Sequence, residues 1–484
     1  MSGAVKHEQW SSRWGFLMAA IGGAVGLGNI WKFPYMTGEN GGGAFVIVYI
    51  AAVLLVAIPI LIAELQLGKR GHKDIISGTR NVAVAAGKSK YWGIIGWLGM
   101  LAAFFVLTYY SVIAGQVIDY FFQTGTGAFS GMTPDEARAQ FDNVEASPWR
   151  MMIGHSVIML ITIAIVARGI QNGIEKAAKI MMPAFFVMLM GMFFYAMVVG
   201  DFARGFEYMF TFDFSKVTPE IVLRAIGQAF FSIGIGFGYM LAFGSYLKDD
   251  ISIPRTSVII SLTDAGVALI AGMVIFPLVF AFGMEPGEGP DLIFRILPMV
   301  FSQMNLGTIV GSVFFLLLTF AALSSAIAIL QPAVSYLEES WGLSVKKAAV
   351  MAGGAAWFLG IGSVLSFSLW KGYYPLSFIK TFETSTVMDV VDFITANYMM
   401  LVGGILITVF VGWSFKPGWA ESEFKGENPV LFTIWLWLAR VFAPAAVAIA
   451  LYVQLTASEL DCEAENLTPE EIAQCLETEQ NQSS

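Results

Sequence analysis

Charged side chains are scarce in this sequence. Asp, Glu, Lys and Arg together make up 13% of its 484 residues, against roughly 25% in an ordinary soluble protein. Hydrophobic residues make up 57% and gather in long runs, for example over residues 44–65. About 20 consecutive apolar residues are enough to span a bilayer as a helix. A soluble globular fold is therefore excluded, and the composition predicts a polytopic protein embedded in a lipid bilayer.

Histidine and cysteine are also rare, with three and two residues. The sequence has no Cys/His cluster, no catalytic triad and no phosphate-binding loop, so neither an enzyme nor a nucleic-acid-binding protein is indicated. Both cysteines, Cys462 and Cys475, lie in a tail, 455–484, that carries eight acidic residues and no basic one. A disulfide between them is one interpretation if the tail is extracytoplasmic. Two unpaired thiols on a solvated acidic tail is the other.

The apolar segments predict eleven membrane spans. They cover residues 14–37, 44–68, 91–122, 150–168, 172–199, 219–247, 257–284, 306–338, 346–366, 388–413 and 430–454. If the N-terminus is inside, the cytoplasmic segments hold 17 of the 27 Lys and Arg residues. Because cytoplasmic loops are enriched in Lys and Arg, we expect residues 1–13 to be cytoplasmic. An odd number of spans then makes the acidic tail extracytoplasmic.

Two of these spans are interrupted by residues that weaken a helix. The stretch IGGAVGLGNIWKFPY, residues 21–35, places four glycines, Asn29 and Pro34 in the first span. Gly234, Gly236 and Gly238 alternate in the sixth span, and each glycine in a helix interior costs roughly 1 kcal/mol relative to alanine. Taken alone, these glycines are equally typical of two helices that pack closely against each other. Interrupted spans at matching places, however, indicate the binding site of a secondary transporter.

The interrupted spans begin two successive sets of five spans, 14–199 and 219–413, and 430–454 adds an eleventh. Since five is odd, the two sets insert with opposite orientations. The predicted fold is therefore an all-α polytopic membrane protein built as a 5+5 inverted repeat. A break frees backbone groups that lipid cannot satisfy, so it must line a cavity or bind a ligand. Freed carbonyls suit sodium, and a helix N-terminus suits a carboxylate.

Residues 10–45, WSSRWGFLMAAIGGAVGLGNIWKFPYMTGENGGGAF, resemble the first span and following loop of the neurotransmitter:sodium symporter family. That family includes bacterial amino-acid transporters such as the bacterial leucine transporter. Further matches follow in family order at YY (109–110), RGIQNGIEKAAKIMMP (168–183), GQAFFSIGIGFG (227–238), LTDAGVALIAGMVIFP (262–277) and ALSSAIAILQP (322–332). The resemblance covers residues 6–455. It implies sodium-coupled uptake of an amino acid by alternating access.

The resemblance also implies two sodium sites. The first would use the carbonyl of Ala24 with the side chains of Asn29, Ser232 and Asp264, and the Ser232 carbonyl in addition. The second would use the carbonyls of Gly22, Val25 and Ala321 with the hydroxyls of Ser324 and Ser325. Hydrogen bonding to their own helix is the alternative interpretation of the two serines, because membrane serines commonly bond the backbone.

Gly26 is the position at which the monoamine transporters of the family carry an aspartate. A glycine leaves room there for a substrate carboxylate beside the first sodium, so the implied substrate is a neutral amino acid. Tyr110 would bind that carboxylate, and Gly234, which replaces a serine of the leucine transporter, would enlarge or depolarise the pocket. The implied substrate-binding residues are Ala24, Gly26, Val106, Tyr110, Phe231, Ser232, Gly234, Phe237, Ser325 and Ile329.

Asp264 is an ionisable residue inside a membrane span, which is costly and indicates a functional site. The family position is more often asparagine, and Ala268, one turn later, replaces a serine of chloride-dependent members. We therefore expect Asp264 to supply the negative charge that chloride would supply, and transport to be chloride-independent and pH-sensitive. Tyr49, Gln228 and Ser232 still match chloride-site positions, so chloride binding stays open as the alternative.

The resemblance implies an outer gate formed by Lys32 and Asp392, with lysine in place of the usual arginine. Lysine cannot form the bidentate pair that arginine forms with a carboxylate. Inner-gate positions match at Trp10, Glu339 and Tyr246, while His7 stands where the family has an arginine. The expected protein is a monomer or homodimer of a bacterial inner membrane. An amino-acid sensor on the same fold, without productive transport, is the main alternative, and a membrane enzyme is a weaker one.

Overall fold

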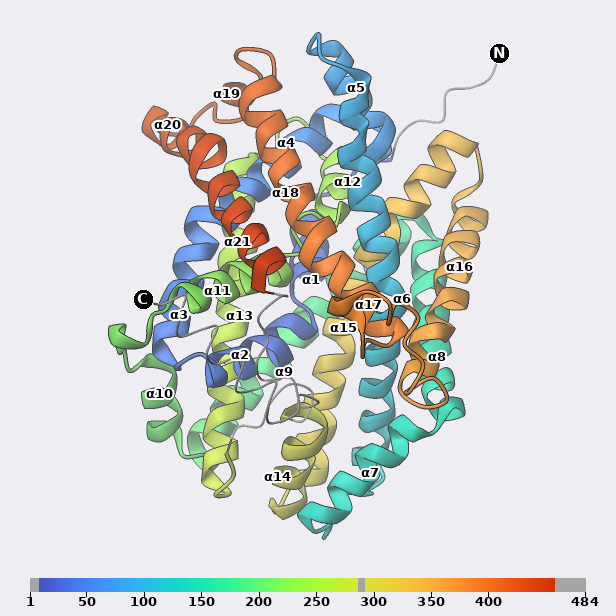
Figure 1. Ribbon diagram of the computed structural model, residues 1–484, viewed down its shortest axis with the longest axis vertical. Coiled ribbons are helices and arrows are strands. Elements are labelled where there is room, and N and C mark those ends of the chain that lie inside the picture. Colours follow the sequence, from blue (N-terminus) through green and yellow to red (C-terminus); the bar gives the residue numbers. More distant parts are fainter. Residues whose placement is uncertain (1–7, 286–291, 458–484) are drawn as a thin grey trace.

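The computed structural model describes residues 8–285 and 292–457 of the chain, and all the regular structure in these residues is helical (Figure 1). The predictions for His7 and for the acidic tail with Cys462 and Cys475 lie outside the described residues. The all-α fold class predicted from the composition is confirmed.

Nine helices among the described residues are long and apolar enough to cross a membrane. Several are continuous runs of α-helix with a π-helical or 3-10 turn, such as α3–η2–α4. The nine are Gly43–Gly71 (α3–η2–α4), Lys90–Gly125 (η3–α6), Pro148–Val166 (α8), Ile170–Val199 (η4–α9), Ile253–Ala281 (α13), Gly307–Trp341 (α15), Val345–Ser366 (α16), Val387–Ser414 (α17–η8–α18–η9) and Pro429–Val453 (α20–η10–α21). Their bounds follow the predicted ranges to within a few residues.

The first and sixth predicted spans are broken, as expected. Arg13–Ala24 (α1) and Gly28–Glu39 (η1–α2) together are apolar enough to form one more span, and they meet at an angle of 51°. Pro219–Ile233 (α11) and Tyr239–Ser245 (α12) are separated by residues 234–238. Within that break Gly234, Gly236 and Gly238 have φ angles of +71°, +81° and +71°. Only glycine adopts this left-handed region without strain, which explains the alternating glycines.

Short helices lie at the two ends of the long ones. At one end lie Ile75–Ala85 (α5) and Trp419–Ser422 (α19), and at the other lie Pro134–Ala146 (α7), Phe202–Phe210 (α10) and Leu297–Gln303 (α14) (Figure 1). We call these ends the α5 side and the α7 side. The span pattern of the sequence did not indicate these helices, because each is too short to cross a bilayer.

The interior of the molecule is built around α15 and α6. Of the most apolar 18-residue stretch, 83% is buried in α15 and 78% in the span that contains α6. The stretches of α9 and of the last span are only 28% buried, with exposed residues such as Val187, Val198 and Trp437. Apolar residues that are exposed in this way suit contact with lipid tails, so α9 and the last span face the bilayer while α6 and α15 form the core.

Candidate functional site

The two helix breaks come together at a buried polar cluster of Asn29, Ser232 and Asp264. Their exposed fractions are 0%, 3% and 0%. The Asn29 Nδ2 group donates to Ser232 Oγ at 2.9 Å, to Asp264 Oδ1 at 2.7 Å and to the Asp264 carbonyl at 3.0 Å. Ser232 Oγ in turn donates to Asp264 Oδ2 at 2.7 Å. Three of the residues expected at the first sodium site are therefore in direct contact, although they are more than 30 residues apart in sequence.

This cluster has the chemistry of a cation site. Three oxygens from Ser232 and Asp264 surround a single amide nitrogen of Asn29. The Asn29 Oδ1 atom accepts from the Gly26 N–H at 3.0 Å, which satisfies a backbone group freed by the break. Turning the amide by half a rotation would place Oδ1 among the other oxygens. The residues then offer only oxygen ligands and one negative charge, which fits a monovalent hard cation.

The residues expected at the second sodium site also gather, where α15 packs against α1. Ser325 Oγ lies 3.4 Å from the carbonyl oxygens of Gly22 and Val25. A Cβ atom added to Gly22 would lie 3.1 Å from Ser324 Cβ. The Ser324 hydroxyl itself bonds the carbonyls of Phe320 at 2.9 Å and Ala321 at 3.0 Å, which is the helix-backbone arrangement common for membrane serines.

Gly26 lies against two hydroxyl groups, those of Ser325 and Tyr110. A Cβ atom at Gly26 would lie 2.7 Å from Ser325 Oγ and 3.1 Å from Tyr110 Oη, so these hydroxyls stand where a side chain would otherwise be. The Tyr110 hydroxyl is buried and has no hydrogen-bond partner among the described residues. Because a buried hydroxyl without a partner costs free energy, this atom is suited to a ligand that accepts a hydrogen bond.

Four more of the predicted substrate-binding residues are apolar: two flank or lie in the break of the sixth span, and two are buried on α6 and α15. Phe231 packs on Phe237 with ring centres 6.3 Å apart, and the Phe231 ring lies against Gly28. Val106 on α6 and Ile329 on α15 are buried to 1% and 5% exposure. Among the side chains expected around a substrate's own side chain, none is charged, which matches a neutral side chain.

Gly234 does not leave open space. A Cβ atom there would lie 2.4 Å from both Cε1 and Oη of Tyr239, so this ring fills the volume that a side chain would use. The sequence analysis did not single out Tyr239, and the only local sign of it was an aromatic residue directly after three glycines. The expectation that Gly234 simply enlarges the pocket therefore has to include Tyr239.

Glu64 is a second residue that the sequence analysis missed. It is fully buried in α4, and its Oε2 accepts from the Gly236 N–H at 3.3 Å, inside the break of the sixth span. A lone carboxyl in the apolar run 44–65 was a sufficient signal, because an ionisable group in a membrane span indicates function. Glu64 thus satisfies a backbone donor that the three glycines leave unpaired.

The residues that match chloride-site positions lie around Asp264. The Tyr49 hydroxyl is buried next to Asp264 and Ser232, and it has no hydrogen-bond partner among the described residues. The Gln228 Nε2 group donates to the Gly28 carbonyl at 3.0 Å. Ala268 is buried and contributes no polar atom. Asp264 is therefore a buried source of negative charge beside Tyr49 and Ser232.

The α5 side of the site is closed by the segment that precedes α1. The Trp10 N–H bonds the Tyr246 carbonyl at 3.1 Å, and Trp10 Nε1 bonds the Phe243 carbonyl at 3.0 Å. Trp10 is fully buried. Glu339 accepts from the Asp74 N–H at 2.9 Å, at the start of α5. Two of the predicted inner-gate residues, Trp10 and Tyr246, are thus in contact, and Glu339 contacts the start of the neighbouring helix.

On the α7 side of the described chain, the two residues predicted to form the outer gate do not contact each other as an ion pair. The Lys32 Nζ atom lies 4.3 Å from the centre of the Phe231 ring, as a cation–π contact. In the part of the chain that the structure describes, no ion pair within 4.0 Å joins Lys32 to Asp392. The conformation therefore has its α5 side closed by Trp10, while the predicted outer pair is apart.

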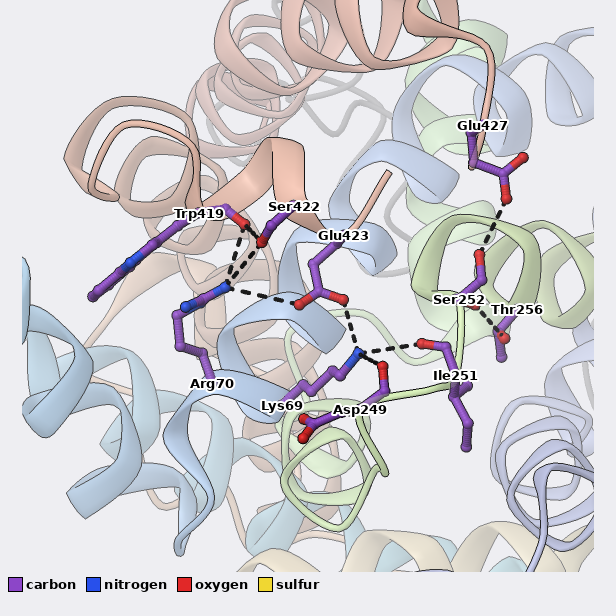
Figure 2. A network of polar contacts seen from close by, with 10 residues as sticks. All are labelled: Lys69, Arg70, Asp249, Ile251, Ser252, Thr256, Trp419, Ser422, Glu423 and Glu427. Carbon is purple, nitrogen blue, oxygen red and sulfur yellow. Dashed lines mark hydrogen bonds and ion pairs between the residues drawn. The ribbon is translucent and has the colours of Figure 1, made fainter. Parts of the chain in front are cut away.

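A second polar network holds the loop of α19 against the bundle on the α5 side (Figure 2). Lys69 at the end of α4 pairs with Glu423 at 2.8 Å and bonds the carbonyls of Asp249 and Ile251, both at 3.2 Å. Arg70 bonds the Trp419 carbonyl at 3.3 Å. The second span, the loop after the sixth span and the loop after the tenth are thereby tied together.

Comparison with known proteins adds a family. The model of the sodium:neurotransmitter symporter family matches residues 7–133 and 135–460. An uncharacterized sodium-dependent transporter of Bacillus subtilis, YhdH, is 35% identical over 447 residues, covering 92% of this chain and 97% of its own. A sodium-dependent neutral amino acid transporter of Bos taurus is 28% identical over 300 residues, 55% of this chain and 40% of its own. The crystal structure of MhsT in complex with L-phenylalanine is similar with a TM-score of 0.84 and 38% identity, covering 92% of this chain and 99% of MhsT.

Proposed function

The chain belongs to the sodium:neurotransmitter symporter family and is a sodium-coupled membrane symporter rather than an enzyme, and on that premise we propose that it takes up a neutral amino acid. The observation that carries the proposal is the Tyr110 hydroxyl, which is buried without a hydrogen-bond partner among the described residues and lies against Gly26, next to the Asn29 cluster. An α-carboxylate placed there would meet a hydroxyl donor on one side and the first sodium on the other.

The substrate side chain would lie among apolar residues. Phe231, Phe237, Val106 and Ile329 provide them, and burial of apolar surface is the main source of affinity in such a pocket. Two relatives agree with this choice, since one is a neutral amino acid transporter and the other was crystallised with L-phenylalanine. A substrate with a charged side chain would lack a partner in this pocket.

We propose two sodium ions as co-substrates. The first would bind among Ala24, Asn29, Ser232 and Asp264, and the second among Gly22, Val25, Ala321, Ser324 and Ser325. The first ion would neutralise Asp264 and the substrate carboxylate together, which explains why substrate binding would require sodium. The two sites share α1, since Ala24 belongs to the first and Gly22 to the second.

Transport would follow by alternating access. Release of substrate toward the α5 side requires Trp10 to leave Tyr246 and Phe243, while closure of the α7 side would bring Lys32 toward Asp392. From the Lys and Arg distribution we infer that the α5 side is cytoplasmic, so the direction of transport would be uptake into the cell. We propose the plasma membrane of a bacterium as the location, with residues 1–13 cytoplasmic and the tail outside.

A sodium-dependent binding screen tests the function. Purified protein would be titrated with the twenty amino acids, with and without sodium, and any hit tested for accumulation in proteoliposomes under an inward sodium gradient. We expect binding of neutral amino acids only in sodium, followed by accumulation. Binding without accumulation would favour the sensor alternative, and no binding of any amino acid would contradict the proposal.

We further propose that transport is chloride-independent because Asp264 supplies the fixed negative charge. Uptake in sodium chloride and in sodium gluconate is expected to be equal for the unchanged protein. Asp264→Asn removes the charge while keeping the shape of the side chain, so its uptake, where it persists, should depend on chloride. Loss of uptake by the unchanged protein in gluconate would refute the proposal. Initial rates of radiolabelled substrate uptake in proteoliposomes provide the measurement.

A further inference from the structure

Tyr239 stands directly after the break in the sixth span, as the first residue of α12. It is 1% exposed, and its hydroxyl donates to the Ile233 carbonyl at 2.5 Å. Ile233 is the last residue of α11, so this carbonyl is among those that a helix end leaves without an intrahelical partner. The side chain of Tyr239 therefore folds back across the break and satisfies the backbone on its other side.

The Tyr239 ring fills the gap between the two broken spans. A Cβ atom added to Gly23 in α1 would lie 2.8 Å from Tyr239 Cε2, and one added to Gly234 would lie 2.4 Å from Tyr239 Oη. Gly23 is next to the proposed ligand position Ala24, and Gly234 is two residues after the proposed ligand position Ser232. The Tyr239 ring therefore contacts both broken spans directly beside the proposed site.

From Tyr239, two more aromatic side chains continue toward the α5 side. Phe243 lies one helical turn later, with its ring centre 6.0 Å from that of Tyr239. Trp10 follows, with its ring centre 5.2 Å from that of Phe243. All three side chains are buried to 1% exposure or less. They form a continuous column between the site and the closed end, and Tyr239 is the member of the column nearest the site.

We infer that Tyr239 is the floor of the substrate site and a determinant of which substrates fit. This inference rests on the proposed uptake of a neutral amino acid and names the residue that limits the depth of its pocket. The ring takes the place of a side chain at position 234, so the size of residue 239 sets the space available beneath the ligand. A smaller residue there would open the floor toward larger substrates.

The test is a comparison of sodium-dependent affinities for L-alanine, L-leucine, L-phenylalanine and L-tryptophan in the full chain. Tyr239→Ala should raise the affinity for tryptophan relative to alanine by about tenfold or more, the lower end of what small changes in pocket size produce. Tyr239→Phe keeps the ring and should leave the ratio unchanged. Phe243→Ala makes a comparable hole one turn farther from the site and should change all four affinities by one common factor.

The contact itself is tested by a double-mutant cycle. Gly234→Ala should weaken binding in the unchanged protein, where the new Cβ meets the Tyr239 ring, and should weaken it much less in Tyr239→Ala. The strain of a left-handed alanine is the same in both backgrounds and cancels. If Tyr239→Ala folds poorly, Tyr239→Leu serves for both measurements.

Two results would overturn the inference. One is an equal change of all four affinities in Tyr239→Ala, including complete loss of binding by a protein of unchanged thermal stability. The other is additive behaviour of Gly234→Ala and Tyr239→Ala. Failure of the proposed function has a different signature, because the unchanged protein would then bind none of the four amino acids in sodium.

Discussion

Asn29→Ala is expected to weaken sodium-dependent substrate binding strongly while the protein still folds. The amide of Asn29 makes three hydrogen bonds to Ser232 and Asp264 and accepts a fourth from Gly26. One of these is to the buried carboxyl of Asp264, and a hydrogen bond to a charged group contributes about 1.5–3 kcal/mol. A loss of this size lowers the affinity by roughly 10- to 150-fold. The measurement is the dissociation constant of the substrate as a function of sodium concentration.

Asn40→Ala is the matched control for this experiment. Asn40 lies just after the end of α2, is 5% exposed, and bonds a single backbone carbonyl, that of Met36, at 2.8 Å. It therefore tests the loss of a buried asparagine in the same region without touching the cluster. We expect its sodium dependence to match that of the unchanged protein. Equal behaviour of the two variants would mean that the Asn29 cluster is not a sodium site.

The fold could be predicted from the sequence because membrane helices leave a local signal. A run such as 44–65 must span the bilayer, and Gly234, Gly236 and Gly238 must break a helix, whatever surrounds them. The short helices gave no such signal. α10, for example, has nine residues, and its position beside α13 is set by packing of Gly205 against Pro277 rather than by length or hydropathy.

The site was predicted only in part, for a related reason. Asn29 and Asp264 are polar residues in apolar surroundings, so each could be noticed alone, but their contact joins positions 235 residues apart. The resemblance to a family supplied the pairing. The resemblance gave no information about other contacts, and these were not predicted. They are Glu64 with Gly236, Tyr239 with Gly23, and Lys69 with Glu423, which is 354 residues away. None of these pairs has a local pattern that joins its members.

Gly26→Ala is expected to prevent substrate binding, because it adds a methyl group against the two hydroxyls beside which the substrate carboxylate is proposed to bind. The added Cβ would lie 2.7 Å from Ser325 Oγ and 3.1 Å from Tyr110 Oη, closer than an ordinary van der Waals contact. The backbone of Gly26 is not in the left-handed region, so the effect belongs to the side chain and not to backbone strain. Misplacing a carboxylate from its hydrogen-bond donor and its cation costs about 3 kcal/mol or more, or roughly 100-fold in affinity.

Gly266→Ala provides the matched control, because it adds the same methyl group two residues from Asp264 in a place where no atom lies within 4 Å. Its substrate affinity should equal that of the unchanged protein. A measurement of sodium binding distinguishes the two possible causes of lost substrate binding in Gly26→Ala. If the methyl group blocks only the carboxylate, ²²Na⁺ should still bind, with reduced affinity at the first site, which lacks the substrate as a ligand. If sodium binding at both sites also disappears, Gly26 acts by shaping the break of α1, and the space beside Tyr110 is not where a carboxylate binds.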